Sequence, residues 1–459
     1  MTDRRTRGRF AELDIMNPKG VRANPARGEG GKRILLDAYE GQAHLLGMSS
    51  PIRRTRYDVV IAGARCAGAS TAMLLARQGL RVLVVDPLRR GSDTLSTHAL
   101  MRGGVLQLHR WGLLDAIRSA GTPAIRKTTF HYGTETIEVP IKPRDGVDAL
   151  YAPRRTVLDL VLVDAALASG AEVVHGQSVV DLLRAPGGRV CGAKIASRDG
   201  DVIEVAADLV VGADGVRSRV ARILEAELDY HVPETTASIY GYWSDLGLEG
   251  YHWFYELGAS VGAIPTNDGE TCVFASLPPG RFENGRRGGL AGLYRELLGE
   301  VSAELADRVA ESDGPGKLKA YAGTAGFLRR AAGPGWALVG DAGYYRDPIT
   351  AHGITDALRD AELLSRAVIE GGDGAITSYQ GARDELVKGL LDVTGRIASF
   401  EWDLDEAKEL HLILSREMNA EVDLLRTLDG ALSAQAAARF SVGAQGGGKT
   451  GGTEGTTVP

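Results

Sequence analysis

A glycine turn between two short apolar segments constrains the fold of this chain more than any other feature of its sequence. Residues 59–62 form the first segment, which has the length of a buried strand, and the turn after it carries Gly63 and Gly68. The next residues are rich in helix formers and contain no proline, and a second apolar segment, residues 82–85, ends at Asp86. This order of strand, turn, helix and strand predicts a βαβ unit with parallel strands.

The same turn predicts a binding site for an adenine dinucleotide. Gly63 permits a sharp turn, Gly68 lets the helix pack close to the strands, and the helix N-terminus offers unpaired N–H groups to a pyrophosphate. Asp86 has the spacing of an acid that accepts hydrogen bonds from a ribose. Arg65 replaces the usual middle glycine and is expected to point outward or to touch phosphate. The residues predicted to line this site are Gly63, Ala64, Ala67, Gly68 and Asp86.

Composition excludes several classes of function. The 459-residue chain has a net charge of −6, which gives no support for nucleic-acid binding. Its three cysteines, Cys66, Cys191 and Cys272, are far apart and odd in number, so we expect no disulfide framework and a reducing, cytoplasmic location. The nine histidines lack metal-ligand spacing, and no apolar run has transmembrane length. We therefore expect neither a metal site nor a transmembrane segment.

Two more turns follow buried strands later in the chain. Residues 212–218 read Gly-Ala-Asp-Gly-Val-Arg-Ser, and residues 340–343 read Gly-Asp-Ala-Gly, followed by Pro348 and by a helix that starts near Gly353. With the first turn, this ordered set resembles the FAD-dependent aromatic hydroxylases. These are the single-component, or group A, flavoprotein monooxygenases with the fold of para-hydroxybenzoate hydroxylase. The resemblance covers roughly residues 57–370.

The resemblance implies FAD as the cofactor and NAD(P)H as a transient reductant, because the sequence shows no second glycine-rich nucleotide fold. It implies that Asp341 contacts the ribityl chain, and that the helix near Gly353 stabilises negative charge on reduced flavin. His352 stands where many members have glutamine. The further residues that it places at FAD are Arg102, Arg155, Asp214, Gly215, Gly340, Pro348, Gly353 and Ile354.

The expected fold is an α/β, or composite α+β, architecture. A Rossmann-like FAD-binding domain is assigned to residues 57–229 and 317–370, and an antiparallel-sheet substrate domain to residues 230–316, with part of 126–150 possibly joining that sheet. Residues 290–309 are expected to form one amphipathic helix. C-terminal helices are assigned to residues 371–440. Disorder is expected at residues 1–56, where Met48 is an alternative start, and at residues 441–459.

The expected activity is monooxygenation. By resemblance, NAD(P)H reduces FAD, O2 forms a flavin C4a-hydroperoxide, and one oxygen atom hydroxylates or epoxidises an electron-rich small substrate. An aromatic-rich stretch is expected either to wall that substrate or to form sheet core, and His352 is expected on the flavin side or in packing. The residues assigned to the substrate pocket are Tyr240, Trp243, Trp253, Tyr255 and His352.

Other activities of the same fold remain open, and no catalytic side chain is assigned. Flavin-dependent halogenases need a Trp-x-Trp-x-Ile-Pro segment, whereas Gly262 and Ser260 stand before Ile264-Pro265 here. A reductase that saturates an alkene or polyprenyl substrate is the second enzyme candidate, because Tyr251-x-Trp253 and Tyr151-Ala-Pro-Arg-Arg faintly resemble such enzymes. A non-enzymatic flavin-fold binding protein is the third.

Overall fold

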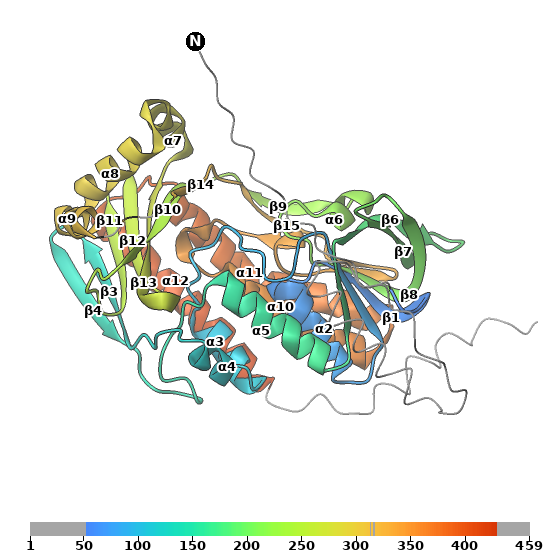
Figure 1. Cartoon of the computed structure of the whole chain (residues 1–459). Coiled ribbons are helices and arrows are strands. Elements are labelled where there is room, and N and C mark those ends of the chain that lie inside the picture. The colour runs from blue at the N-terminus through green and yellow to red at the C-terminus, as the bar shows by residue number, and fades with distance from the viewer. Residues whose placement is uncertain (1–51, 313, 315–316, 429–459) are drawn as a thin grey trace, which may run out of the picture. The chain divides into compact units, whose positions relative to one another are not determined.

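A computed structural model describes residues 52–312, 314 and 317–428 of the chain (Figure 1). Most of the predicted N-terminal extension, including Met48, and the predicted C-terminal tail lie outside the described residues. The first described residues are already ordered by contacts, since the backbone N–H of Arg53 donates to Glu172 at 2.9 Å. Strand β1 begins at Arg56.

The predicted βαβ unit lies at the centre of an eight-stranded sheet. Its strand order is β16 (Ala332–Gly333), β17 (Trp336–Leu338), β8 (Val202–Gly212), β1 (Arg56–Ala62), β2 (Val82–Asp86) and β5 (Glu172–His175), with β6 (Gln177–Arg184) and β7 (Val190–Ser197) joined through β8. The β17, β8, β1, β2 and β5 strands pair in parallel. Every residue of β2 is buried, which explains why this strand reads as a continuous apolar run.

Three helices pack together against this sheet. Helix α2 (Cys66–Ala76), the helix of the βαβ unit, lies between α5 (Arg155–Ala168) and α10 (Gly353–Glu370), as Figure 1 shows. All eleven residues of α2 are buried. Such a helix has no exposed stripe, so it needs small residues all round, and its Cys-Ala-Gly-Ala-Ser-Thr-Ala sequence supplies them.

The second large sheet has seven strands. Its order is β14 (Lys319–Tyr321), β10 (Ala237–Ser244), β13 (Glu270–Leu277), β12 (Ala259–Pro265), β11 (Tyr251–Glu256), β3 (Lys127–Tyr132) and β4 (Glu135–Pro140). All neighbours are antiparallel except β3 and β11, which pair in parallel. Strands β3 and β4 come from the 126–150 segment, and β14 comes from the part of the chain assigned to the FAD-binding domain.

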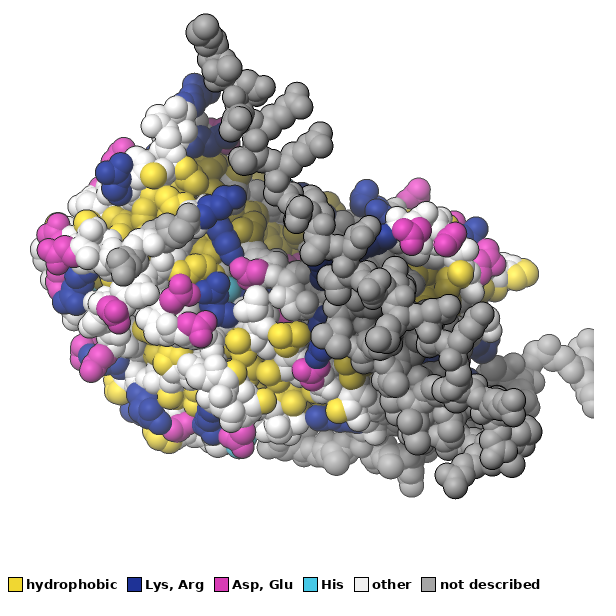
Figure 2. Space-filling model, in the orientation of Figure 1, with side chains coloured by type: hydrophobic (Ala, Val, Ile, Leu, Met, Phe, Trp, Pro, Cys, Tyr) yellow, Lys and Arg dark blue, Asp and Glu magenta, His cyan; other side chains and the backbone are white. Residues whose placement is uncertain are grey.

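The two faces of this sheet belong to different cores. One face packs with helices α7 (Pro279–Gly285), α8 (Leu290–Val301) and α9 (Ala303–Glu311), and we call it the outer face. The other, which we call the inner face, shares one core with the eight-stranded sheet. Figure 2 shows hydrophobic side chains gathered, with basic ones beside them, where Figure 1 places α7, α8 and neighbouring strands.

The single helix predicted for residues 290–309 is wrong, because Ser302 interrupts it. Ser302 has an extended backbone, with φ −156° and ψ 101°, and its hydroxyl accepts a hydrogen bond from Leu305 N as the N-cap of α9. Serine is favoured at an N-cap over a helix interior, because its hydroxyl can bond the unpaired backbone N–H groups of the next helix. The chain therefore turns at this point and lays two shorter helices on the sheet.

The remaining elements connect and cover the two sheets. They are the short sheet of β18 (Tyr344–Tyr345), β15 (Gly326–Arg329) and β9 (Leu228–Val232), and the helices α3 (Arg102–Arg110), α4 (Leu114–Ser119), α6 (Arg219–Ile223), α11 (Gly372–Ala398) and α12 (Leu404–Thr427). Together these elements confirm the predicted α/β composite. Of the helices in the described ranges, none combines the length and the apolar character that crossing a bilayer requires.

Candidate active site

The glycine turn after β1 is closely packed and requires its glycines. Gly63 has φ +105°, and a Cβ there would lie 2.3 Å from the carbonyl oxygen of Ala213. A Cβ on Gly68 would lie 1.9 Å from the carbonyl oxygen of Gly63. The first turn of α2 thus presses against the backbone that precedes it. Ala67, in that first turn, is 8% exposed.

Asp86 and Arg65 both fix the loops around this turn. The Asp86 carboxylate accepts hydrogen bonds from Ala64 N at 2.9 Å and from Leu88 N at 2.8 Å. Arg65 is the N-cap of α2, and its guanidinium donates to Asp159 at 2.7 Å and to two carbonyl oxygens of the loop after β2, at residues 92 and 93. Arg65 therefore joins the turn to α5 and to the next loop, a contact that the sequence did not indicate.

Arg155 and Asp341 bring opposite charges to this region. Arg155 begins α5, and its Nε donates to Asp159 at 3.0 Å. Asp341 follows β17, and its carboxylate has no hydrogen bond to another described residue. Burial, reinforced by Asp356 and opposed by Arg155, raises the pKa of Asp341 to about 7. A partly buried acid without donors suits the hydroxyl groups of a ribityl chain, which would supply them.

Arg102, Asp214 and Gly215 have local structural contacts. Arg102 begins α3 and donates to the carbonyl oxygen of Lys142 at 2.8 Å, while its pKa is lowered by burial. Asp214 accepts hydrogen bonds from Ser218 Oγ at 2.5 Å and from Arg219 N at 2.7 Å, which joins it to the start of α6. Gly215 has φ +79° and open space where a Cβ would lie. Their assignment to FAD stays a prediction.

The turn after β17 carries the other predicted cofactor residues. Gly340, with φ +56°, donates its N–H to Asp360 at 3.1 Å. Pro348 begins a short 3-10 turn, Pro348–Thr350, that Asp347 caps through Ile349 N at 2.9 Å. Asp347 also accepts a hydrogen bond from Thr236 N at 2.7 Å, so this turn is bonded to the residue just before β10.

Helix α10 begins with its N-terminal end open. A Cβ on Gly353, its first residue, would meet no atom within 4 Å, and the Gly353 residue is exposed. Ile354 is partly buried. The first helical hydrogen bond runs from Asp356 N to the carbonyl oxygen of His352 at 3.0 Å. The preceding N–H groups are therefore available to a bound group, as the helix-terminus prediction requires.

The described residues fit FAD at three points. The glycine turn before α2 presents a helix N-terminus, Asp341 has a partly buried carboxylate without a donor, and the first residue of α10 faces open space. Each point matches a different part of the cofactor in the predicted order: pyrophosphate, ribityl chain and flavin ring. The chain therefore offers hydrogen-bond donors and an acceptor for the successive parts of one dinucleotide.

Three of the four aromatic residues assigned to the substrate pocket share the inner face. Tyr240, Trp253 and Tyr255 all belong to the core that this face shares with the eight-stranded sheet. Trp243 lies instead on the outer face, where its ring stacks on Tyr294 of α8 with 5.4 Å between ring centroids. The assignment of Trp243 to the pocket is corrected, because successive residues of β10 alternate between the faces.

The alternation of β10 identifies a residue that the sequence assignment missed. Tyr242 lies on the same face as Tyr240, and its hydroxyl is 2.5 Å from Nε2 of His98. His98 is 1% exposed, and its Nδ1 has no hydrogen-bond partner among the described residues. Burial lowers the pKa of His98 to about 3, and Arg154, whose guanidinium lies 3.7 Å from the Tyr242 ring centroid, acts in the same direction. His98 is therefore neutral, and its unpartnered ring nitrogen can take part in a hydrogen bond but is a weak base.

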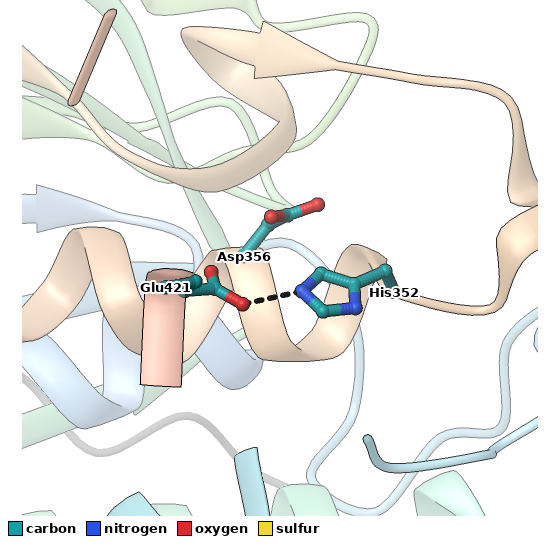
Figure 3. A group of neighbouring side chains, drawn as sticks. All are labelled: His352, Asp356 and Glu421. Carbon is teal, nitrogen blue, oxygen red and sulfur yellow. Dashed lines mark hydrogen bonds and ion pairs between the residues drawn. The ribbon is translucent and has the colours of Figure 1, made fainter. Parts of the chain in front are cut away.

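His352 does not join the aromatic residues. Its ring is 1% exposed, and its Nε2 lies 2.6 Å from Oε2 of Glu421 on α12, as Figure 3 shows. The assignment of His352 to the substrate pocket is therefore not supported by its contacts. A partner 69 residues away in the chain gave no signal in the sequence around His352.

Comparison with known proteins gives the site a context. Residues 56–394 match the family described as FAD binding domain. The chain is 30% identical to a menaquinone reductase of Mycolicibacterium smegmatis, covering 73% of this chain and 81% of that protein. It is 23% identical to a squalene monooxygenase of Candida glabrata, covering 72% and 74%. A solved structure of a probable FAD-dependent monooxygenase from Pseudomonas aeruginosa superposes with a TM-score of 0.65 at 20% identity, covering 79% of this chain and all of that one.

Proposed function

Because this chain belongs to the FAD-binding domain family and is an FAD-dependent oxidoreductase, we propose that it is a monooxygenase driven by NAD(P)H. The proposed reaction joins an electron-rich organic substrate, O2, NAD(P)H and one proton. It yields the hydroxylated or epoxidised product, NAD(P)+ and water. The similarity to squalene monooxygenase supports this class of reaction.

The observation that carries the proposal is the core that the two sheets share. Tyr240, Trp253 and Tyr255, on the inner face of the seven-stranded sheet, belong to the same continuous core as Ile349 and Ala351, which lie between Asp341 and α10. Aromatic side chains on the sheet face that shares a core with the proposed flavin turn offer apolar surface to a flat substrate. A dry wall at that point also excludes water from the reacting groups, which an oxygen transfer requires.

The residues of the chain have separate tasks in this proposal. Asp341 and Arg155 bind and orient the cofactor, and the N-terminus of α10 stabilises negative charge on it. Bound FAD would supply the redox chemistry, which takes two electrons from NAD(P)H and uses them to activate O2. The inner face holds the substrate, and the neutral His98–Tyr242 pair offers hydrogen-bonding groups at its edge. No metal has a task in this scheme.

The test uses purified protein with stoichiometric FAD. NAD(P)H oxidation and O2 uptake are measured in the presence of each member of a panel of phenols, indoles and alkenes. The expected result is faster FAD reduction and product containing one oxygen atom from ¹⁸O2 when the substrate is present. Oxygen-independent saturation of an alkene would contradict monooxygenation. Equal NAD(P)H oxidation with every compound, with all O2 recovered as hydrogen peroxide, would also contradict it.

A reductase is the second candidate. The 30% identity to menaquinone reductase favours it, and saturating a double bond needs a hydride and a proton. The Tyr242 hydroxyl lies 2.5 Å from His98 on the inner face and could orient a substrate by a hydrogen bond, while the proton for saturation would come from solvent. Anaerobic incubation of reduced protein with a quinone or polyprenyl compound separates the candidates, because only a reductase gives a reduced product without O2. The non-enzymatic reading is not retained, since the relatives are oxidoreductases.

A further inference from the structure

A buried charged cluster lies directly behind the first turn of α10. Figure 3 shows His352, Asp356 and Glu421, which come from the residue before α10, from α10 itself and from α12. Glu421 is 0% exposed and Asp356 is 2% exposed. Glu421 lies beyond residue 394, where the family match ends, so α12 adds to this region a group from outside the matched segment.

Two arginines complete the cluster. Arg359 donates to Asp356 at 2.5 Å and to Glu421 at 2.7 Å, and it is 0% exposed. Arg346 donates through Nε to Asp356 at 2.9 Å and through NH1 to Thr394 on α11 at 3.2 Å. The charged and titratable groups that face His352 from the elements around it are Glu421 on α12, Asp356, Arg359 and Asp360 on α10, Arg346 in the preceding loop and Tyr344 on β18.

The charges of this cluster do not balance without His352. Asp356, Asp360 and Glu421 carry three negative charges, whereas Arg346 and Arg359 carry two positive charges. Arg383 also acts on Asp360, but its ion pair with Asp384 cancels its charge, and an ionised Asp341 adds a further negative charge near Asp356 and Asp360. A net charge without solvent is costly, and a proton on His352 would cancel it. Burial raises the pKa of Glu421, but the hydrogen bonds from His352 and Arg359 outweigh it and lower that pKa, so Glu421 stays ionised.

A divalent cation is the alternative way to balance the cluster. Ligand atoms of His352, Asp356 and Glu421 lie within 4.8 Å of one another. However, the guanidinium of Arg359 already bridges the two carboxylates, and a cation there would stand against it. The Nε2 of His352 must also carry a proton to donate to the ionised Glu421, so it is not free as a metal ligand.

We propose that Glu421 keeps His352 protonated, so that α12 places a positive charge at the N-terminus of α10, where the flavin is proposed to bind. His352 Nδ1 is buried, has no hydrogen-bond partner among the described residues and points away from the cluster in Figure 3, so the charge of the ring acts on the helix end through space. The imidazolium adds to the helix dipole and favours reduced, negatively charged FAD. Glu421 is then a positioning residue that acts through His352. This inference rests on the proposed FAD site, but not on the choice between monooxygenase and reductase.

The first test is the midpoint potential of bound FAD in His352→Gln. Loss of one nearby positive charge should weaken the binding of reduced FAD relative to oxidised FAD on the order of tenfold. For a two-electron couple a tenfold change corresponds to about 30 mV, here towards more negative potential. His352→Lys keeps a positive charge and should restore a potential close to that of the wild type. Glu417→Gln, one turn earlier on α12, is the matched control and should leave the potential unchanged.

The second test separates Glu421 from a merely structural role. Glu421→Gln keeps the shape of the side chain but removes the charge that holds the proton on His352. Its potential should follow the wild type at low pH and His352→Gln at high pH, with a step between pH 6 and 9 that wild type and Glu417→Gln lack. In the apo-protein, ¹⁵N NMR of labelled histidine should show one ring with both nitrogens protonated at pH 8. That signal should be absent from His352→Gln and lost in Glu421→Gln.

Three results would overturn the inference. The first is an FAD potential of Glu421→Gln and His352→Gln that tracks Glu417→Gln across the pH range. The second is a neutral His352 in the apo-protein spectrum, which decides the question even where a variant fails to hold FAD. The third is a stoichiometric divalent metal whose removal reproduces the His352→Gln potential. None of these measurements uses substrate, NAD(P)H or O2, so a protein that binds FAD without turnover would refute the proposed function and leave this inference standing.

Discussion

The guanidinium of Arg383 lies directly behind Gly343. A Cβ added to Gly343 would be 2.7 Å from NH1 of Arg383, which is 0% exposed. Arg383 cannot withdraw, because its NH2 donates to the carbonyl oxygen of Arg329 at 2.9 Å and it pairs with Asp384. The buried arginine of α11 therefore restricts position 343 to glycine.

Gly343→Ala should therefore lower the free energy of unfolding by about 1–3 kcal/mol, the usual range for overpacking a rigid site. Urea denaturation measures the change. In an Arg383→Met background the same substitution should add almost no further loss, because the guanidinium that it would meet is gone. Equal losses in the two backgrounds would show that Arg383 does not restrict Gly343.

Gly68 and Gly353 should respond to alanine in opposite ways. Gly68→Ala forces a Cβ into the Gly63 carbonyl group and should destabilise the apo-protein by at least about 3 kcal/mol. Gly353→Ala meets open space at the start of a helix, so apo stability should stay level or rise by up to about 1 kcal/mol. If the flavin lies there, only the affinity for FAD falls, which flavin fluorescence titration measures. An unchanged FAD affinity in Gly353→Ala would move the flavin away from this helix end.

Tyr242 and Trp243 are neighbours in the chain but belong to different faces. Trp243→Phe reduces the area that stacks on Tyr294 and should cost about 1–2 kcal/mol of stability without changing the KM for substrate. Tyr242→Phe removes one hydroxyl, costs about 1 kcal/mol, and should alter KM or the ratio of product to NAD(P)H consumed. Chemical denaturation and steady-state kinetics on the same preparations separate the two effects. The reverse pattern would place the substrate outside the inner face.

Asp341 links cofactor binding to the dependence of stability on pH. Its pKa is raised to about 7 in the folded protein, so its contribution to stability is present below the usual aspartate pKa and is lost as the pH rises through 7. Asp341→Asn should therefore stabilise the apo-protein at pH 8, by about 2 kcal/mol, and change it little at pH 4. The same variant should lose FAD on gel filtration and become colourless. Retention of stoichiometric FAD would show that Asp341 is not a cofactor ligand.

The parts of the site that follow from short segments could be predicted from the sequence. Glycine turns after buried strands are local patterns, so the order of the turns at Gly63, Asp214 and Asp341 identified the family and the fold. The alternation of β10 is also local, but which of its faces turns inward depends on α8 and is not written in the strand itself. Trp243 was misplaced for that reason.

Long-range partners could not be predicted in the same way. Arg65 pairs with Asp159, 94 residues later, and His352 pairs with Glu421. A buried ionic group is stable only with partners that tertiary structure brings to it, so no local window contains the information. Departures from the family pattern at Arg65 and His352 looked unexplained in the sequence because their partners lie on other helices.

The parallel pairing of β3 with β11 bears on how such an enzyme can acquire a new substrate. The seven-stranded sheet draws strands β3 and β4 from the first third of the chain and β14 from after α9, so no continuous stretch encodes it. A chimaera made by exchanging residues 230–316 with a relative would bring in four strands and leave three behind. This sheet therefore cannot be exchanged by replacing one continuous segment, and changes of specificity have to come from individual substitutions on its inner face.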